Sequence, residues 1–129
     1  MTILLDSSVL IDVLRERRGR RELLTQWLHE GHILACCAVN ITELHAGMRK
    51  GEEGITARLF DGLDYIEIPP AAARRAGDLL REWRRRGRTL SLPDAMIGAM
   101  AVELGLALAT DNRKDFPMAE LRFMPVPEA

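Results

Sequence analysis

The sequence predicts an α/β fold, a three-layer helix–sheet–helix sandwich with a mainly parallel sheet. Short apolar runs recur at 3–5, 33–39, 65–68 and 106–109. Segments with the apolar spacing of helices separate these runs, as they do in βαβ units. Two of the runs, 33–39 and 106–109, are apolar without interruption, which is typical of strands that are covered on both faces.

The helix starts are expected at residues that favour caps. Ser7 or Ser8 is expected to cap the first helix, and residues 40–43, Asn-Ile-Thr-Glu, have the spacing of a capping box. Residues 91–94, Ser-Leu-Pro-Asp, are typical of a helix start with proline in the first turn. Further helices are expected around 23–28, 53–63 and 72–83, and a last strand near 123–124.

Composition limits the class of protein. A chain of 129 residues, 47% of them hydrophobic, fits one domain, 1–129, with a proper core. It has no apolar run of the ~20 residues that span a bilayer, and its first residues lack the features of a signal peptide, so we expect a cytoplasmic protein without membrane contact. Cys36 and Cys37 are sequence neighbours, which favours buried apolar filler over a zinc or redox site.

The net charge of −1 conceals a local basic stripe. Arginine outnumbers lysine sixteen to two, and seven arginines fall between Arg74 and Arg88. Such a stripe can bind phosphates on a protein that is nearly neutral. It is also what a solvated helix face looks like, and charge alone favours that second interpretation.

Acidic residues follow the predicted strands or begin the predicted helices. They are Asp6, Glu43, Asp94, Asp111 and Asp115. Ligands of open parallel sheets bind beyond the carboxyl ends of the strands, so these acids are expected to meet at one edge. Carboxylates in a cluster suit Mg²⁺ or Mn²⁺, and two cations ~3.5–4 Å apart can hold and hydrolyse a phosphodiester.

Three of these acids also have a structural interpretation. Glu43 and Asp94, taken singly, are more often helix caps, and Asp111 could serve a turn. Asp6 has no such explanation, because an acid that closes a buried strand has little structural purpose. Their joint placement favours a site. The three histidines form no acid–base pair, and neither a glycine-rich phosphate loop nor a nucleophile elbow is present.

Four segments, taken in order, resemble the motifs of PIN-domain ribonucleases, notably VapC-type toxins of type II toxin–antitoxin systems. They are Ile3-Leu4-Leu5-Asp6-Ser7-Ser8 with Val9-Leu10-Ile11, Val39-Asn40-Ile41-Thr42-Glu43-Leu44 with Gly47, 91–99, and 109–116. Each motif alone is weak, but four in order cover nearly the whole chain. The resemblance implies a PIN-like fold and a single PIN-like nuclease domain over 1–129.

The resemblance also implies an activity and its residues. It implies an endoribonuclease that needs Mg²⁺ or Mn²⁺ and leaves 5′-phosphate and 3′-hydroxyl ends. Asp6, Glu43 and Asp94 match the three core acids, as catalytic residues and metal ligands. Asp111, Asn112 and Asp115 are alternatives for completing the metal site, with Asp115 also expected among the catalytic residues. Thr110 is expected at the substrate, orienting an acid or a water, while Arg84, Arg85, Arg86 and Arg113 are expected to hold the RNA backbone.

The partners follow from the same resemblance. They are an RNA substrate, a second copy of the chain in a homodimer, and a small VapB-like antitoxin that inserts into the active-site groove. Two alternatives remain: a PIN-fold nuclease of RNA processing outside a toxin–antitoxin system, and a catalytically silent RNA-binding module. The intact acids argue against the silent module, because binding RNA requires cations rather than carboxylates.

Overall fold

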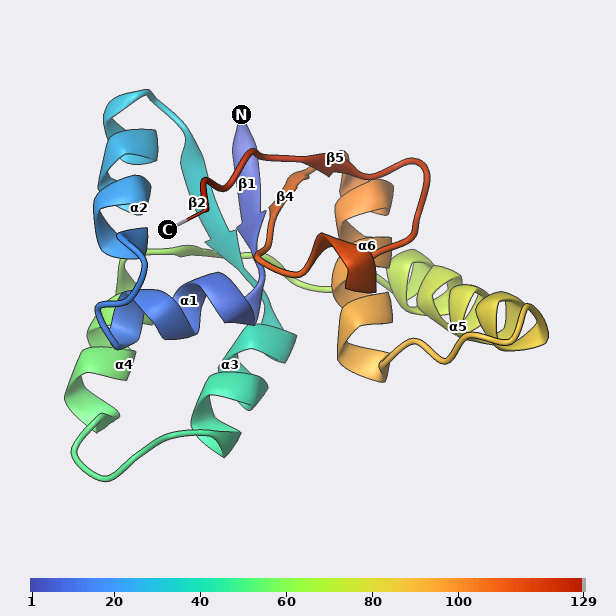
Figure 1. The fold of residues 1–129 in the computed structure, drawn as a ribbon, viewed down its shortest axis with the longest axis horizontal. Coiled ribbons are helices and arrows are strands. Elements are labelled where there is room, and N and C mark those ends of the chain that lie inside the picture. The colour runs from blue at the N-terminus through green and yellow to red at the C-terminus, as the bar shows by residue number, and fades with distance from the viewer. Residues whose placement is uncertain (129) are drawn as a thin grey trace.

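A parallel five-stranded sheet forms the middle layer of the protein (Figure 1). The structure is a computed structural model that describes residues 1–128. The strand order is β3-β2-β1-β4-β5, and every neighbouring pair is parallel. The strands are β1 (Thr2–Leu5), β2 (Ile33–Cys36), β3 (Asp64–Tyr65), β4 (Ala107–Ala109) and β5 (Arg122–Phe123). The predicted α/β class with a mainly parallel sheet is confirmed.

Helices form the two outer layers. Figure 1 shows α1, α2 and α4 on one side of the sheet and α6, with α5 packed against it, on the other. The elements are α1 (Ser7–Leu14), α2 (Arg20–His29), α3 (Ala38–Ala46), α4 (Glu53–Asp61), α5 (Pro70–Arg85), α6 (Leu92–Leu104) and the short 3₁₀ helix η1 (Arg113–Asp115). Within residues 1–128, no helix is long and apolar enough to cross a membrane.

The central strand β1 shows why three layers form. Its side chains alternate between the faces of the sheet, as strand geometry requires. Ile3 and Leu5 pack into the core beneath α1 and α2, whereas Leu4 packs into the core beneath α6. All three are fully buried. Both faces of the strand therefore need an apolar cover, which the uninterrupted apolar run predicts.

The start of α3 differs from the expectation. The apolar run 33–39 predicts one strand, but β2 ends at Cys36 and α3 begins at Ala38. Asn40 therefore lies in the first turn of the helix and is not its cap. Its Oδ1 accepts the backbone N–H of Cys37 at 2.8 Å, which satisfies a donor that the turn frees from the sheet. Hydrophobicity alone does not reveal where such a chain turns.

The two cysteines behave as the sequence predicts. Both are free and buried. Burial, with the nearby charges of Cys37 and Asp64, raises the pKa of the Cys36 thiol to about 11. A thiol with this pKa stays protonated at neutral pH, so it packs as an apolar group.

Gly98 allows the segment after η1 to lie directly on α6. A Cβ at this position would come within 2.7 Å of Met118 Cε and 3.4 Å of Phe116 Cδ1. Both of these side chains are buried in the core beneath α6. The close approach fixes where η1, which ends at Asp115, sits relative to α6.

Replacing Gly98 with leucine should therefore destabilise the protein, because a side chain would be forced into occupied volume. We expect a loss of about 1–3 kcal/mol in the free energy of unfolding, measured by urea denaturation. Gly77→Leu is the matched control, since Gly77 is on α5 and has nothing within 4 Å of its Cβ position. Equal stability of the two variants would show that the contact with α6 is not tight.

Candidate active site

The carboxyl ends of β1 and β4 bring distant parts of the chain together. These strands are parallel neighbours, with Leu5 opposite Ala109. Asp6 follows β1, and its backbone N–H donates to the carbonyl of Ala109 at 2.9 Å. Thr110 and Asp111 follow β4 directly. The sheet therefore places the first and last predicted motifs side by side.

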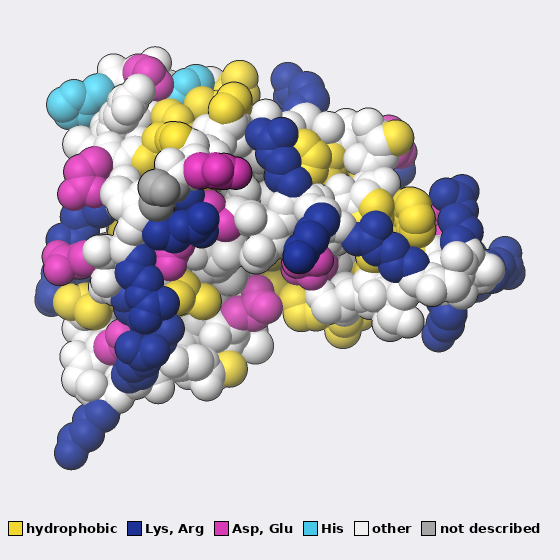
Figure 2. All heavy atoms as spheres, in the orientation of Figure 1, with side chains coloured by type: hydrophobic (Ala, Val, Ile, Leu, Met, Phe, Trp, Pro, Cys, Tyr) yellow, Lys and Arg dark blue, Asp and Glu magenta, His cyan; other side chains and the backbone are white. Residues whose placement is uncertain are grey.

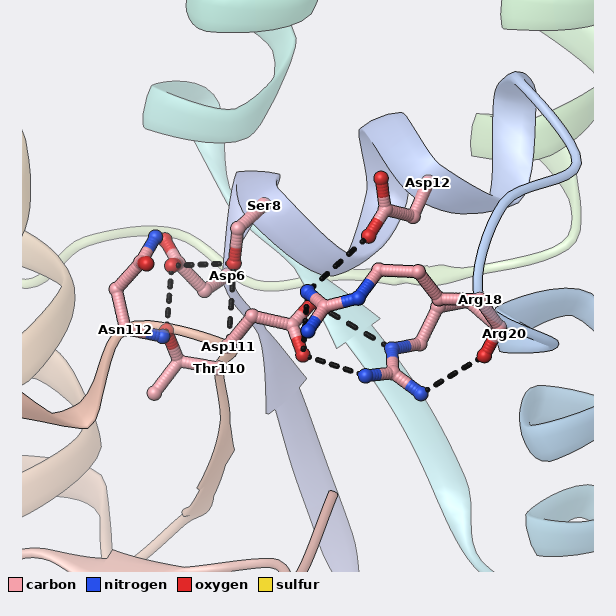
Figure 3. Close-up of polar contacts among 8 residues, drawn as sticks. All are labelled: Asp6, Ser8, Asp12, Arg18, Arg20, Thr110, Asp111 and Asn112. Carbon is pink, nitrogen blue, oxygen red and sulfur yellow. Dashed lines mark hydrogen bonds and ion pairs between the residues drawn. The ribbon is translucent and has the colours of Figure 1, made fainter. Parts of the chain in front are cut away.

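Asp6 is held by three hydrogen bonds from its own surroundings (Figure 3). Its Oδ1 accepts the backbone N–H of Ser7 at 2.9 Å. Its Oδ2 accepts the hydroxyls of Ser8 at 2.9 Å and Thr110 at 2.7 Å. Asp6 is 5% exposed and is itself the N-cap of α1. The expectation that Ser7 or Ser8 caps this helix is wrong, because the serine hydroxyls are used on carboxylates instead.

A second hydrogen-bond chain holds Glu43. The hydroxyl of Ser7 donates to Glu43 Oε1 at 2.8 Å. Asn40 is fully buried, and its Nδ2 donates to the hydroxyl oxygen of Ser7 at 3.1 Å and to the carbonyl of Leu5 at 2.9 Å. Because α3 starts before Asn40, the side chain of Asn40 points toward β1 and supports the serine that binds Glu43.

The three hydroxyls share one arrangement. Each accepts an N–H group and so directs its own proton toward a carboxylate. Ser7 accepts from the Asn40 amide, while Ser8 and Thr110 accept the backbone N–H groups of Asp111 and Asn112 at 3.3 and 3.0 Å. Sequence reasoning missed Ser7, Ser8 and Asn40 as site residues. Their signal was polarity inside otherwise buried segments.

Thr110 has the orienting contact that the sequence predicts. It is 3% exposed, and its hydroxyl is engaged by both Asp6 and the N–H of Asn112. This arrangement favours a role in holding Asp6 over a direct contact with substrate, which stays a prediction. Asn112 itself is exposed, and its backbone takes part in the network.

Asp94 and Asp115 approach the same place from the other face of the sheet. Asp94 lies in the first turn of α6, where its N–H donates to the Ser91 hydroxyl at 3.2 Å, and Asp115 ends η1. Burial raises the pKa of Asp94 above its usual range. A side-chain hydrogen bond with Ser91 acts in the opposite direction, and the negative charges of Asp6, Asp115 and Glu43 raise the pKa again. We call these four residues, Asp94 and the three acids whose charges act on it, the carboxylate cluster.

Asp111 is at the same edge but is neutralised. Its Oδ1 lies 2.7 Å from Arg20 Nη2 and 3.4 Å from Arg18 Nη1, and its Oδ2 accepts from Arg20 Nε at 3.4 Å (Figure 3). The predicted metal ligands therefore fall into two groups. The contacts of Asp111 favour an ion pair for this residue, and the charge environment of Asp94 favours Asp115 as the fourth member of the site.

The predicted RNA-binding arginines lie in two places. Arg84, Arg85 and Arg86 are exposed at the outer end of α5, where basic side chains gather in Figure 2. Arg86 pairs with Glu82 at 2.8 Å and lies over the Trp83 ring. In contrast, Arg113 lines a pocket of about 430 Å³ that Thr110 and Asp111 also line. Arg113 therefore lies near Thr110 and Asp111, whereas the α5 arginines lie at the end of that helix that points away from the sheet.

Arg88 connects the arginine run to the site. Its guanidinium lies 5.7 Å from the centre of the Trp83 ring and donates to the carbonyl of Lys114. Lys114 precedes Asp115 in η1. The loop after α5 is therefore fixed next to the helix that carries a member of the carboxylate cluster.

The carboxylate cluster carries uncompensated negative charge. Within residues 1–128, none of its four members forms an ion pair with a lysine or arginine. In the same part of the chain, no three acidic, histidine or cysteine side chains already converge on one point at ligating distance. Repulsion between like charges opposes such convergence, and a divalent cation would remove it. An all-oxygen donor set of this kind fits Mg²⁺ or Mn²⁺.

Comparison with known proteins gives the same family as the motifs. The family model described as PIN domain matches residues 3–121. The protein "Ribonuclease VapC10" of Mycobacterium tuberculosis is 39% identical over 118 residues, which are 92% of this chain and 88% of that protein. The predicted resemblance to VapC-type proteins is confirmed.

Solved structures extend the likeness to three dimensions. A toxin–antitoxin complex from Klebsiella pneumoniae contains a chain with 30% identity and a TM-score of 0.74, covering 92% of this chain and 94% of that one. A DNA-bound VapBC complex from Salmonella typhimurium matches with a TM-score of 0.81, 21% identity and coverage of 96% and 97%. The PIN-like fold that the sequence predicts is confirmed by these neighbours.

Asp94→Asn should stabilise the metal-free protein at neutral pH. A carboxyl whose pKa is raised by folding binds more protons in the folded state, so stability falls as pH rises from the usual aspartate range through the raised pKa. Removing this charge should raise the melting temperature in EDTA near pH 7 by a few degrees. Below about pH 3.8, where the unfolded carboxyl is also protonated, the gain should disappear.

Thermal unfolding of both proteins across this pH range checks the expectation. Asp78→Asn is the control, because Asp78 is exposed on α5 and pairs with Arg81. A melting temperature for Asp94→Asn that is lower than that of the unchanged protein at neutral pH would contradict the account of the charge cluster.

Proposed function

Because this chain belongs to the PIN domain family, we propose that it is a metal-dependent endoribonuclease that acts as the toxin of a toxin–antitoxin pair. The observation that carries the proposal is the carboxylate cluster. Asp6 and Glu43 accept hydrogen bonds from hydroxyl or backbone donors, and none of the four acids has a cationic partner within residues 1–128. We propose residues 1–129 as a single PIN-like nuclease domain.

The cluster would hold Mg²⁺ or Mn²⁺. Asp6 and Asp94 are proposed as direct ligands, Glu43 as a ligand either directly or through water, and Asp115 as the fourth acid. When bound, such a cation activates water and neutralises charge that develops on the phosphate. The chain's own contribution is orientation, because Ser8 and Thr110 fix Asp6 and Ser7 fixes Glu43.

The proposed reaction is hydrolysis of an RNA phosphodiester. Water attacks phosphorus in line with the departing 3′-oxygen, and the products carry 5′-phosphate and 3′-hydroxyl ends. The 2′-hydroxyl is not the nucleophile in this scheme. We propose that Arg113, which is exposed and lines a pocket together with Thr110, binds a phosphate of the RNA backbone.

Two alternatives remain for the biological setting. The first is a PIN-fold nuclease of RNA processing outside a toxin–antitoxin system, which would use the same site. A silent RNA-binding module is disfavoured, since four unpaired carboxylates would repel phosphates. The toxin interpretation is favoured because the Klebsiella pneumoniae chain with 30% identity belongs to a toxin–antitoxin complex.

We propose a small VapB-like antitoxin as the partner. An arginine or lysine reaching the carboxylate cluster would gain charge-assisted hydrogen bonds and displace the cations that cleavage needs. The apolar face of α1 does not offer a docking surface for this partner, because its residues Leu10 and Val13 are buried in the core of the chain. Beside Glu43, however, a small pocket of about 80 Å³ remains between α1 and α3, lined partly by Ile11 and Leu14. We also propose that the chain forms a homodimer.

Purified protein should cleave RNA with Mg²⁺ or Mn²⁺ and lose this activity in EDTA. Asp6→Asn, Glu43→Gln, Asp94→Asn and Asp115→Asn should each lower the rate by about 100-fold or more, as expected for changes that disorganise a metal site. Asp78→Asn, on the exposed face of α5, should cleave normally. The measurement is the rate of cleavage of a labelled RNA, with mapping of 5′ ends.

Expression in cells provides the matching biological result. The unchanged protein should arrest growth, and the four variants should not. Cleavage that persists in EDTA, or full toxicity of all four variants, would show that the carboxylate cluster is not the catalytic centre.

The arginines at the end of α5 should contribute to affinity rather than to chemistry. Changing Arg84, Arg85 and Arg86 to glutamine should raise KM, leave kcat nearly unchanged and flatten the salt dependence of binding. Arg122→Gln is the control. Arg122 pairs with Ala107 at the amino end of β4 and donates to the carbonyl of Gly105, so it lies away from the carboxyl ends of the strands that carry the site. Binding that is unchanged at several salt concentrations would identify the run as a solvated helix face.

A further inference from the structure

Arg20 is an arginine buried beside the candidate site. It is 2% exposed, although it begins a surface helix. Its Nη2 and Nε contact the two carboxylate oxygens of Asp111 at 2.7 and 3.4 Å, and its Nη1 donates to the carbonyl of Arg18 at 3.0 Å. Figure 3 shows this guanidinium aimed along Asp111 toward the group that surrounds Asp6.

The turn before α2 has an unusual backbone that produces this contact. Glu16, Arg18 and Gly19 have φ angles of 53°, 57° and 66°. Two of these three residues carry side chains that disfavour the left-handed region, so the surrounding structure must hold them there. The turn brings both Arg18 and Arg20 to a single carboxylate, that of Asp111.

A continuous path of hydrogen bonds leads from Asp111 to Asp6. The backbone N–H of Asp111 donates to the Ser8 hydroxyl at 3.3 Å, and this hydroxyl donates to Asp6 Oδ2 at 2.9 Å. A serine hydroxyl rotates freely unless its acceptor side is occupied. The Asp111 N–H occupies an acceptor site of the Ser8 hydroxyl and so favours the rotamer that directs the Ser8 proton at Asp6.

Fixing Asp111 also fixes its two neighbours. Thr110 donates to the same oxygen of Asp6, and Asn112 supplies the N–H that orients the Thr110 hydroxyl. Both hydroxyl donors on Asp6 Oδ2 thus depend on the three residues after β4. The side chain of Asp111 anchors this segment to the turn before α2 and to the start of α2.

Burial of the ion pair also requires a reason. Removing two charges from water is costly, and well-packed uncharged residues often give equal or greater stability. A pair retained only for stability should therefore be replaceable by neutral residues without other consequences. If the pair orients Asp6, its replacement by neutral residues should weaken cation binding even where the stability is kept.

We propose that Arg20 is a positioning residue, which acts through Asp111 and Ser8 to orient the Asp6 carboxylate for cation binding. The inference rests on the proposed function, because it assigns Asp6 as a metal ligand. Arg20 touches neither the RNA nor the cation in this arrangement.

The decisive variant is the double change Arg20→Met with Asp111→Asn. Arg20→Met alone should lower the melting temperature, because it leaves Asp111 buried with weaker compensation. The double variant should regain the melting temperature of the unchanged protein. Its affinity for Mn²⁺, measured by calorimetry, should nevertheless be about 10-fold weaker, the effect typical of removing a residue that orients a metal ligand.

Two further measurements identify the path. With Ser8→Ala as background, the double change should weaken Mn²⁺ binding by clearly less than about 10-fold, since the Ser8 branch is already broken and only the Thr110 branch is left to disturb. Without any metal, the backbone amide at position 111 should be about fivefold less protected from hydrogen exchange in the double variant, after correction for the different intrinsic exchange rates of aspartate and asparagine, as expected when a hydrogen bond is lost. Arg21→Gln is the control for both, because Arg21 is the next residue on α2 and forms an exposed pair with Glu16.

The outcomes separate the two proposals. Unchanged Mn²⁺ affinity and unchanged amide exchange in the stable double variant would make the pair purely structural and overturn the role of Arg20. An effect that multiplies in full with that of Ser8→Ala would also overturn it. If the unchanged protein binds no Mn²⁺, the proposed function fails, while amide exchange still decides whether Arg20 positions Asp111.

Discussion

The carboxylate of Asp6 is held by hydrogen-bond donors that carry no charge, and the rest of the site depends on this constraint. A backbone N–H and two hydroxyls fix its orientation without cancelling its negative charge. Such donors carry no positive charge of their own and leave room for a cation. An arginine in their place would have produced a stable ion pair and occupied the position of the metal.

Paired and unpaired acids lie next to each other at the carboxyl ends of the strands. Asp111 is paired with Arg20 and Arg18, while the carboxylate cluster receives no such partner within residues 1–128. The chain thus separates an acid that stabilises the local fold from acids that repel one another. Burial raises the pKa of Asp94 above its usual range, and the charges of Asp6, Asp115 and Glu43 raise it further. In the proposed function, this unpaired charge serves to bind the cation.

Much of the fold follows from patterns that the sequence displays. Fully apolar strands separated by amphipathic helices require a covered parallel sheet, and the rule that ligands bind at the carboxyl edge places Asp6 and Asp111 together. The exact turns could not be predicted. The strand β2 ends at Cys36, and the Asn40 side chain accepts the N–H of Cys37 where α3 begins. The sequence suggests that Asn40 is itself a helix cap, and it does not reveal this contact with Cys37.

The division of the acids was also beyond the sequence. Asp111, Asn112 and Asp115 fall within five residues, and spacing cannot tell which one meets an arginine. Arg20 lies 91 positions before Asp111, in a turn whose left-handed residues include two that are not glycine. No local pattern predicts that backbone. Likewise, Ser7 and Ser8 read as helix caps until the fold shows that their hydroxyls are directed at Glu43 and Asp6.

Anomalous diffraction from crystals soaked in Mn²⁺ tests the central claim most directly. The account predicts an anomalous peak among Asp6, Glu43, Asp94 and Asp115, with Asp111 still bound to Arg20. A peak coordinated by Asp111, with its arginines displaced, would contradict the division of the acids. The absence of a peak at Mn²⁺ concentrations that support RNA cleavage would contradict the carboxylate cluster as a metal site.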